Sequence, residues 1–255
     1  MNLEINGPRI WFEIPLGGIT IPITDTVISS FIVMVVLCTL CVVLGRGLTK
    51  RPGKRQVIVE KMVTMLYNMV RDTMGEHNMK FAPYIGALFA SSILGTLIST
   101  TGVFRSATAD LSTTATWAIM TTLIVWGSNI RENGFLGWLK GFTEPVVVMT
   151  PMNLISEFAS PVSMAFRHFG NVVGGSVLTT LIYLALAGVS SMVLGWIPNA
   201  FIASIPIFQV GIPAVLSLYF DFFSGFIQAL VFCMLSMVYI GAANPPHEEK
   251  TEESK

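Results

Sequence analysis

Long apolar runs alternate with short polar segments along the whole chain. A transmembrane helix needs roughly 20 predominantly apolar residues, and each run is near that length or longer. The runs cover residues 25–44, 82–103, 113–130, 154–186 and 206–243. The pattern therefore predicts an all-α integral membrane protein with about five transmembrane helices, of which the third is rather short.

The segment between the first two runs has a different pattern. In "QVIVEKMVTMLYNMVRDTMGEHNMK" the apolar residues recur at mostly helical spacing, with charged residues between them. This spacing predicts an amphipathic helix over residues 56–78 that lies on the cytoplasmic surface of the membrane. A solvated linker helix is the alternative interpretation.

The last two runs are longer than a bilayer requires. They hold 33 and 38 residues, which is about 50–57 Å of helix, against a hydrocarbon thickness of about 30 Å. Helices of this length must tilt strongly or project beyond the membrane. Residues 151–243 are therefore predicted to form a long, tilted, antiparallel hairpin, followed by a short polar cytoplasmic tail over 244–255.

Charge sets the predicted orientation. The first run ends at "RGLTKRPGKR", which holds five positive charges and no negative one, and such clusters face the cytoplasm. Residues 1–24 then form an outer segment, and the C-terminus is cytoplasmic. The first 25 residues lack a basic start followed by a short apolar core, so we expect no cleavable signal peptide and a single membrane domain over 1–255.

Composition agrees with a membrane protein and argues against several other classes. The chain is 53% hydrophobic and 12% charged, whereas soluble domains carry about 25% charged residues. Its net charge is zero, which gives no electrostatic basis for binding nucleic acid. Cys38 and Cys41 form a C-x-x-C within an apolar run, without a histidine or carboxylate nearby. We interpret them as small apolar side chains rather than as a redox or metal motif.

The sequence contains no nucleotide-binding glycine loop, no metal-ligand cluster and no nucleophile beside a base. We therefore expect no cofactor, no metal and no catalytic chemistry in the chain itself. An internal repeat, which is common in secondary transporters, is also missing.

Arg167 is a charged residue deep inside the predicted hairpin. Arg167 lies inside "SPVSMAFRHFGNVVGGSVLTTLIYLALAG", and between residues 168 and 246 the only other fixed charge is Asp221. A charge at the bilayer centre costs at least about 2.5–3.5 kcal/mol, so Arg167 must face protein or water and is a functional candidate. The alternative is snorkelling, in which the side chain reaches the cytoplasmic surface.

Counting outwards from the predicted turn of the hairpin places Arg167 and Gln228 at one depth. Ser176 and Asp221 share a second depth, roughly 10 Å nearer the outer side. Helical spacing puts Asn171 on the face of Arg167, and the polar face of the last run carries Asp221, Ser224, Gly225 and Gln228. We therefore predict a polar column that leads from the outer side to Arg167 and stops there.

An arginine at this position suits a partner carboxylate that approaches it and later moves away. The guanidinium stays protonated at any relevant pH, so it does not relay protons itself. It favours the charged form of an approaching carboxylic acid and blocks direct passage of ions between two aqueous paths. The glycines of "GNVVGG" permit close approach of another helix, either from a partner or within this chain.

Several motifs resemble subunit a of F-type ATP synthases. "SPVSMAFRHFGNVVGG" resembles that family's R-L-F-G-N signature, and "SATADLSTT" resembles its P-T-A-D-x-N-x-T loop. "PMNLISEFASP", "IPITDTVISSF" and "IQALVFCMLSMVYIGAA" are similar to the segment before its arginine, the start of its first span and its last helix. The resemblance covers most of the chain in the right order.

The resemblance implies a membrane stator beside a rotating ring of small hairpin c subunits, each with a membrane carboxylate. Two offset half-channels would load and unload those carboxylates, so that H⁺ or Na⁺ flow drives ATP synthesis. It also implies peripheral-stalk b subunits as partners, an indirect link to the catalytic head, contact with lipid, and a bacterial plasma membrane location. By motif match the separator is Arg167, and the ion-pathway residues are Asn171, Gln228, the inner-side Glu157 and the outer-loop Asp110.

Three departures from the family pattern matter. His168 stands where leucine usually follows the arginine. It points about 100° away from Arg167 on a helix, either as a packed or lipid-edge residue or as a polar group near the pathway. Ser176 stands where many members carry a carboxylate, so the outer ionisable group is expected on Asp221. The loop proline is Ser106 here.

Two other functions are compatible with the composition. A stand-alone transporter or channel would use Arg167 to bind an anionic substrate and Asp221 as a gate. A purely structural scaffold is the third hypothesis, but it gives no reason for polar residues at matched depths.

Overall fold

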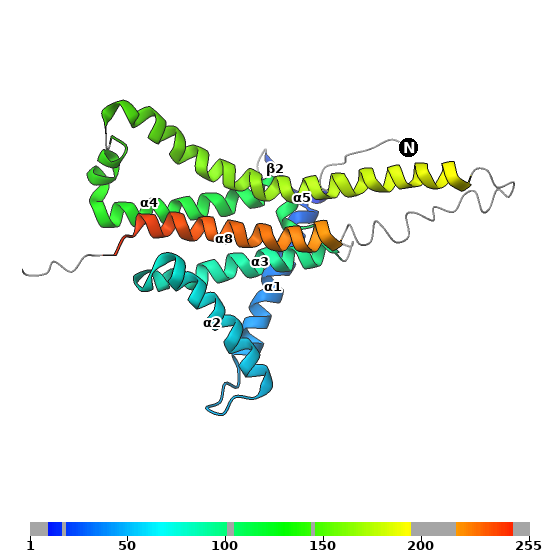
Figure 1. The fold of residues 1–255 in the computed structure, drawn as a ribbon, viewed down its shortest axis with the longest axis horizontal. Coiled ribbons are helices and arrows are strands. Elements are labelled where there is room, and N and C mark those ends of the chain that lie inside the picture. The colour runs from blue at the N-terminus through cyan, green and yellow to red at the C-terminus, as the bar shows by residue number, and fades with distance from the viewer. Residues whose placement is uncertain (1–9, 17–18, 101–104, 144–145, 195–217, 247–255) are drawn as a thin grey trace, which may run out of the picture. The chain divides into compact units, whose positions relative to one another are not determined.

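The computed structural model describes residues 10–16, 19–100, 105–143, 146–194 and 218–246, and nearly all of them are helical (Figure 1). This confirms the all-α fold. The α-helices are α1 (Asp25–Gly45), α2 (Lys54–Met74), α3 (Ala82–Thr100), α4 (Leu111–Gly141), α5 (Thr150–Leu194) and α8 (Ser224–Ala243). Short 3₁₀ segments occupy Glu76–Phe81, Ala107–Ala109 and Val147–Met149, and a π-helical segment, Leu218–Phe223, precedes α8.

Four of the described helical segments are long and apolar enough to cross a membrane: Asp25–Gly45, Glu76–Ser99, Val147–Val193 and Ser224–Ala243. The predicted third span lies in α4, which is less apolar because its first half is rich in threonine and its second half carries charged residues. α4 also changes direction at Gly134, whose φ of 70° is a conformation that glycine adopts readily. The five predicted spans thus correspond to the four apolar helices and α4.

The helices of the predicted hairpin do not begin and end where the apolar runs do. α5 has 45 residues and begins at Thr150, before the apolar run starts, and Pro161 lies within it. The π-helical segment and α8 account for the second half of the returning run. Residues 206–217, which the sequence assigns to the same run, lie outside the described residues.

A β-hairpin precedes α1, which the apolar pattern does not predict. Strands β1 (Ile10–Leu16) and β2 (Ile19–Thr24) pair antiparallel, with Ile10 opposite Thr24 and Phe12 opposite Ile23. β2 continues directly into α1.

By packing, the chain divides into two compact units. The first unit comprises residues 1–34, 92–111 and 167–229, and the second comprises 35–91, 112–166 and 230–255. In the first unit the start of α8 approaches α3 closely. A Cβ added to Gly225 would lie 2.7 Å from Thr96 Cγ2, so only glycine fits at this contact.

In the second unit α8 packs against α3 and α4 (Figure 1). Phe232 meets Trp117 edge-on, with ring centroids 6.2 Å apart, and the Cys233 thiol lies 3.8 Å from the carbonyl oxygen of Ile85. Met237 is completely buried in the same core. These contacts make α8 the centre of this unit.

α2 ends at Gly75, whose φ of 82° directs the chain into the 3₁₀ turn before α3. The turn is fastened to the residues after α8 through one backbone carbonyl. His77 Nε2 lies 2.7 Å from the carbonyl oxygen of Asn244, and Asn78 Nδ2 donates to the same oxygen at 3.1 Å.

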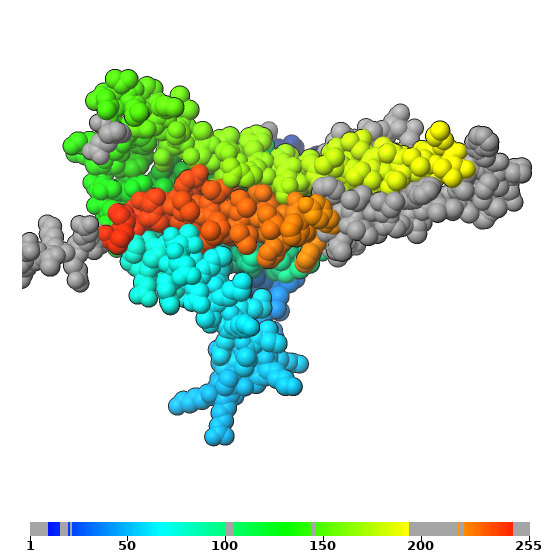
Figure 2. All heavy atoms as spheres, in the orientation of Figure 1, coloured from blue at the N-terminus to red at the C-terminus, as the bar shows by residue number. Residues whose placement is uncertain are grey.

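The loop before α2 and the first half of that helix are exposed, and Figure 2 shows the side chains near residue 50 extending outwards. Within α2, only Val70 and Met74 are buried. The placement of α2 on the cytoplasmic surface stays a prediction.

Candidate functional site

Arg167 lies in the first unit, on an exposed face of α5. Among the described residues, no ion pair or hydrogen bond is found for its guanidinium. Phe166, its neighbour in the chain, is 54% exposed. A Cβ built on Gly170 or Gly174 would have no atom of the chain within 4 Å. The arginine is therefore a charged group on an apolar helix surface, with an open glycine stripe beside it.

Four residues further along α5, Asn171 binds α8. Its Nδ2 donates to Ser224 Oγ at 2.8 Å, and Oδ1 lies 3.1 Å from the same hydroxyl oxygen. The two helices run in opposite directions (Figure 1). Because Arg167 precedes Asn171 by four residues and Gln228 follows Ser224 by four, Arg167 and Gln228 lie at the same level of the helix pair.

Two buried side chains flank this level. Gln228 is 7% exposed, and its Nε2 has no hydrogen-bond partner among the described residues. His168 is 1% exposed, and its Nε2 lies 3.3 Å from Ser92 Oγ of α3. His168 is thus packed inside the chain rather than at a lipid edge, and it contacts α3.

A polar cluster joins the start of α1 to the loop before α4. Thr26 Oγ1 donates to Asp110 Oδ2 at 2.8 Å. Next to it, the indole N–H of Trp11 in β1 donates to Asp25 Oδ1 at 2.7 Å. The predicted loop residue Asp110 is therefore held by a buried threonine. The β-hairpin supplies an indole donor to Asp25, a second, buried carboxylate at the start of α1 that was not among the predicted site residues.

Two residues of the predicted polar column remain, Ser176 and Asp221, and the structure describes the side chain of Ser176 only. Ser176 is exposed, and its hydroxyl donates to the carbonyl oxygen of Val173 at 2.8 Å. Asp221 belongs to the π-helical segment Leu218–Phe223. The position of the Asp221 side chain lies outside what the structure describes, so its role stays a prediction.

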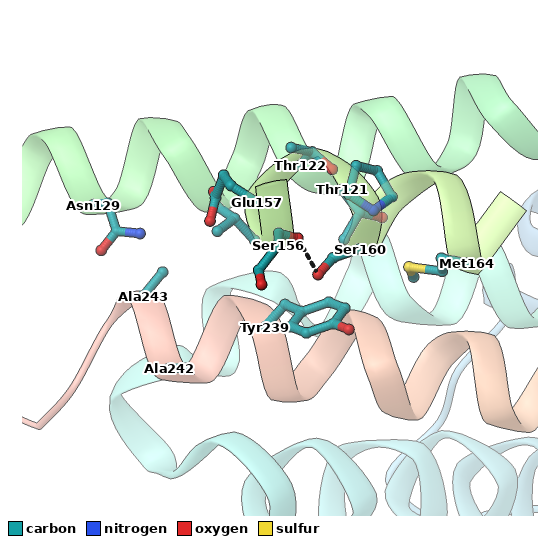
Figure 3. A pocket seen from close by; sticks show the side chains of 12 residues that line it. Thr121, Thr122, Asn129, Ser156, Glu157, Ser160, Met164, Tyr239, Ala242 and Ala243 are labelled. Atoms are coloured by element: carbon teal, nitrogen blue, oxygen red, sulfur yellow. Dashed lines mark hydrogen bonds between the residues drawn. The ribbon is translucent and has the colours of Figure 1, made fainter. Parts of the chain in front are cut away.

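Glu157 lies in the second unit and is half-buried on α5. It lines a cavity of about 250 Å³, which Figure 3 shows between α4, α5 and α8. The polar side chains around this cavity include Thr121, Thr122, Ser160 and Tyr239. Pro161 also lines it and has no backbone N–H, so the Glu157 carbonyl oxygen lacks its usual helical donor.

A second, more polar cavity of about 470 Å³ shares Glu157 with the first. Its lining includes three asparagine side chains, Asn129, Asn133 and Asn153. Amide and carboxylate oxygens are ligands suited to hard cations or water. Among the described residues, no three His, Cys, Asp or Glu side chains gather as a metal site.

Comparison with known proteins identifies the family. A family model described as "ATP synthase A chain" matches residues 27–241. The chain belongs to this family. It is 33% identical to "ATP synthase subunit a, sodium ion specific" of Propionigenium modestum over 266 residues, which cover 92% of this chain and 84% of that protein.

Two further relatives carry the name ATP synthase subunit a. The protein of Legionella pneumophila is 31% identical and aligns over 94% of both chains. The protein of Crocosphaera subtropica, named ATP synthase subunit a 1, is 31% identical over 91% of both chains. Membership of the ATP synthase A chain family makes this protein a component of an ATP synthase complex. Its bacterial relatives and apolar helices support a multi-pass plasma membrane protein.

Within this ATP synthase A chain, the predicted residues fall into separate groups. Arg167, Asn171 and Gln228 gather around the contact between α5 and α8. Asp110 lies in the polar cluster at the start of α1, and Glu157 lies at the cavities of the second unit. Sequence reasoning missed Trp126, whose indole N–H donates to Glu157, because the two residues are 31 positions apart.

Proposed function

We propose that this chain is the ion-translocating stator of a rotary ATP synthase. It provides two offset half-channels, separated by Arg167, that load and unload the carboxylates of a ring of c subunits. Ion flow through these half-channels, of H⁺ or Na⁺, turns the ring and drives ATP synthesis in the catalytic head. The chain itself carries out no catalytic chemistry.

The observation that carries this proposal is the exposed guanidinium of Arg167 on an apolar helix, which has no ion pair within the described part of the chain. A cation in that position is too costly to face hydrocarbon. A neighbouring protein must therefore cover it and offer an anion. The open surface at Gly170 and Gly174 lets a helix of that neighbour come close, and a carboxylate on each ring subunit supplies the charge.

Arg167 acts through its permanent charge. The guanidinium does not deprotonate, so it lowers the proton affinity of each ring carboxylate that arrives and releases the bound ion. It also repels cations that would pass directly between the half-channels. Gln228 lies at the same level and belongs to the ion pathway in this proposal, and its Nε2 is buried without a partner among the described residues.

The remaining residues divide between the two half-channels. Asp110, Ser176 and Asp221 belong to the outer path, and Glu157 with its polar cavities belongs to the inner path. The N-terminus then lies outside and the C-terminus in the cytoplasm, as the basic loop after α1 favours. Peripheral-stalk b subunits hold the chain still relative to the head, and membrane lipid covers its remaining apolar surface.

Substituting Arg167 tests the proposal. In the assembled complex, R167A is expected to abolish ATP synthesis driven by an ion gradient, while the catalytic head still hydrolyses ATP. Arg55→Ala, which removes an exposed charge at the start of α2, is the matched control and should leave coupling unchanged. Full coupled synthesis by R167A, or ion transport by the purified chain alone, would contradict the proposal.

A further inference from the structure

The carboxylate of Glu157 is held by a single tryptophan. Trp126 Nε1 of α4 donates to Glu157 Oε1 at 2.5 Å. An indole N–H donates and has no acceptor function, and a hydrogen bond to an ionised carboxylate is shorter and stronger than one between neutral groups. The contact therefore fixes one oxygen of the Glu157 side chain against α4.

The indole is itself fixed by other aromatic rings. Trp138 lies with its ring centroid 5.9 Å from that of Trp126, and Phe158 meets Trp126 nearly edge-on at 6.0 Å. Such pairs restrict the orientation of the ring. Trp126 thus presents its N–H in one direction.

Glu157 lies where the two cavities of the second unit meet. Both are lined by Glu157 together with Asn129 and Ser156, and Glu157 is the charged residue that the two linings share. Figure 3 shows Glu157 between the α4 side chains and Tyr239 of α8.

The other titratable groups of the neighbouring helices are few. Tyr239 from α8 lines the smaller cavity, and Cys233 of α8 faces Ile85 instead. The charged residues of α4, which are Arg131, Glu132 and Lys140, line neither cavity. Glu157 is therefore the carboxylate that dominates the electrostatics of both cavities within the described residues.

We propose that Trp126 is a positioning residue of the inner half-channel, which fixes the Glu157 side chain where the two cavities share their lining. This inference rests on the proposed function. Without the indole N–H, the Glu157 side chain would lose the donor that holds its orientation.

The variant W126F removes the donor and keeps an aromatic ring. In inverted membrane vesicles that carry the whole complex, ATP-driven ion uptake is measured against the pH of the outer solution, which bathes the cytoplasmic face. We expect this profile to change, because the Glu157 side chain loses the donor that orients it. The profile against the pH of the vesicle interior should not move.

A double mutant separates positioning from packing. E157Q removes the carboxylate and should abolish the pH response of the cytoplasmic face, and W126F combined with E157Q should behave like E157Q alone. Trp117→Phe is the matched control, because Trp117 lies on the same helix, packs against Phe232 and lines neither cavity. It should leave the profile unchanged.

The outcomes distinguish this inference from the proposed function. An unchanged profile in W126F, or additive effects of W126F and E157Q, would overturn the positioning role. If E157Q has a normal profile while R167A abolishes coupled ATP synthesis, the positioning role is overturned but the stator role is left intact. If W126F does not assemble into the complex, benzothienyl-alanine at position 126 keeps the shape of the indole without its N–H. That variant must then change the profile against cytoplasmic pH in the same way.

Discussion

The two packing units differ in what surrounds their polar side chains. In the first unit several polar side chains bind one another, as Asn171 binds Ser224 and Thr26 binds Asp110, although Gln228 Nε2 has no partner among the described residues. In the second unit, polar groups from α4, α5 and α8 surround open cavities around Glu157. Paired groups fix helices in place, because each satisfied hydrogen bond is costly to break. Groups around a cavity remain available to water and ions.

Among the described residues, the Arg167 guanidinium has no ion pair, and it lies on an exposed face of α5 in the first unit. In the proposed function another protein covers this face, whereas the contacts of Gly225 and Asn171 serve the chain's own fold. Three experiments test that distinction, in addition to R167A and W126F.

The largest effect is expected for a change that touches only the open glycine stripe. A Cβ at Gly174 would have no atom of the described residues within 4 Å, so Gly174→Leu should leave the melting temperature of the purified chain unchanged. Under the proposed function, coupled ATP synthesis should fall by roughly tenfold or more, because the added bulk would keep a ring helix away from Arg167. A lower melting temperature with intact coupling would show that the stripe serves internal packing.

Gly225 gives the opposite result, because its neighbour lies inside the chain. A Cβ would lie 2.7 Å from Thr96 Cγ2, so Gly225→Ala should destabilise the chain by about 1–3 kcal/mol. Thermal unfolding in detergent measures the loss. Thr96→Ser removes that methyl group and should restore part of the stability in the double variant; no restoration would mean that another contact limits the site.

The smallest effect concerns the pair Asn171 and Ser224. A double-mutant cycle with N171A and S224A should give a coupling energy of about 0.5–1.5 kcal/mol, typical of one neutral hydrogen-bonded pair. The measurement is again thermal or denaturant unfolding in detergent. Strictly additive losses would mean that the α5–α8 register does not depend on this contact.

The sequence predicts well whatever depends on hydrophobicity alone. The apolar runs predict the helices that cross the membrane, and the lone charge singles out Arg167. The β-hairpin could have been predicted from the sequence. Gly17-Gly18 separates two segments rich in residues that favour β-strands, which is a common hairpin signal. The predicted hairpin, 151–243, begins one residue after the start of α5 at Thr150, although the apolar run itself begins only at residue 154.

Contacts between distant parts of the chain could not be predicted from the sequence. Trp126 lies in a run that reads only as membrane helix, and its partner is in the next helix. The cavities depend in the same way on how α4, α5 and α8 pack, which no local pattern encodes. The buried Asp25 is part of the quoted motif "IPITDTVISSF", but its bond to Trp11 requires the β-hairpin.

The contact between His77, Asn78 and the residue after α8 has a consequence for how this chain can vary. Its acceptor is the main-chain oxygen of Asn244, and every amino acid carries that atom. Substituting the side chain at 244 leaves the acceptor in place, whereas inserting or deleting one residue late in α8 presents a different oxygen or none. This contact therefore depends on the length of α8. It tolerates substitutions at position 244, but not an insertion or deletion within the helix.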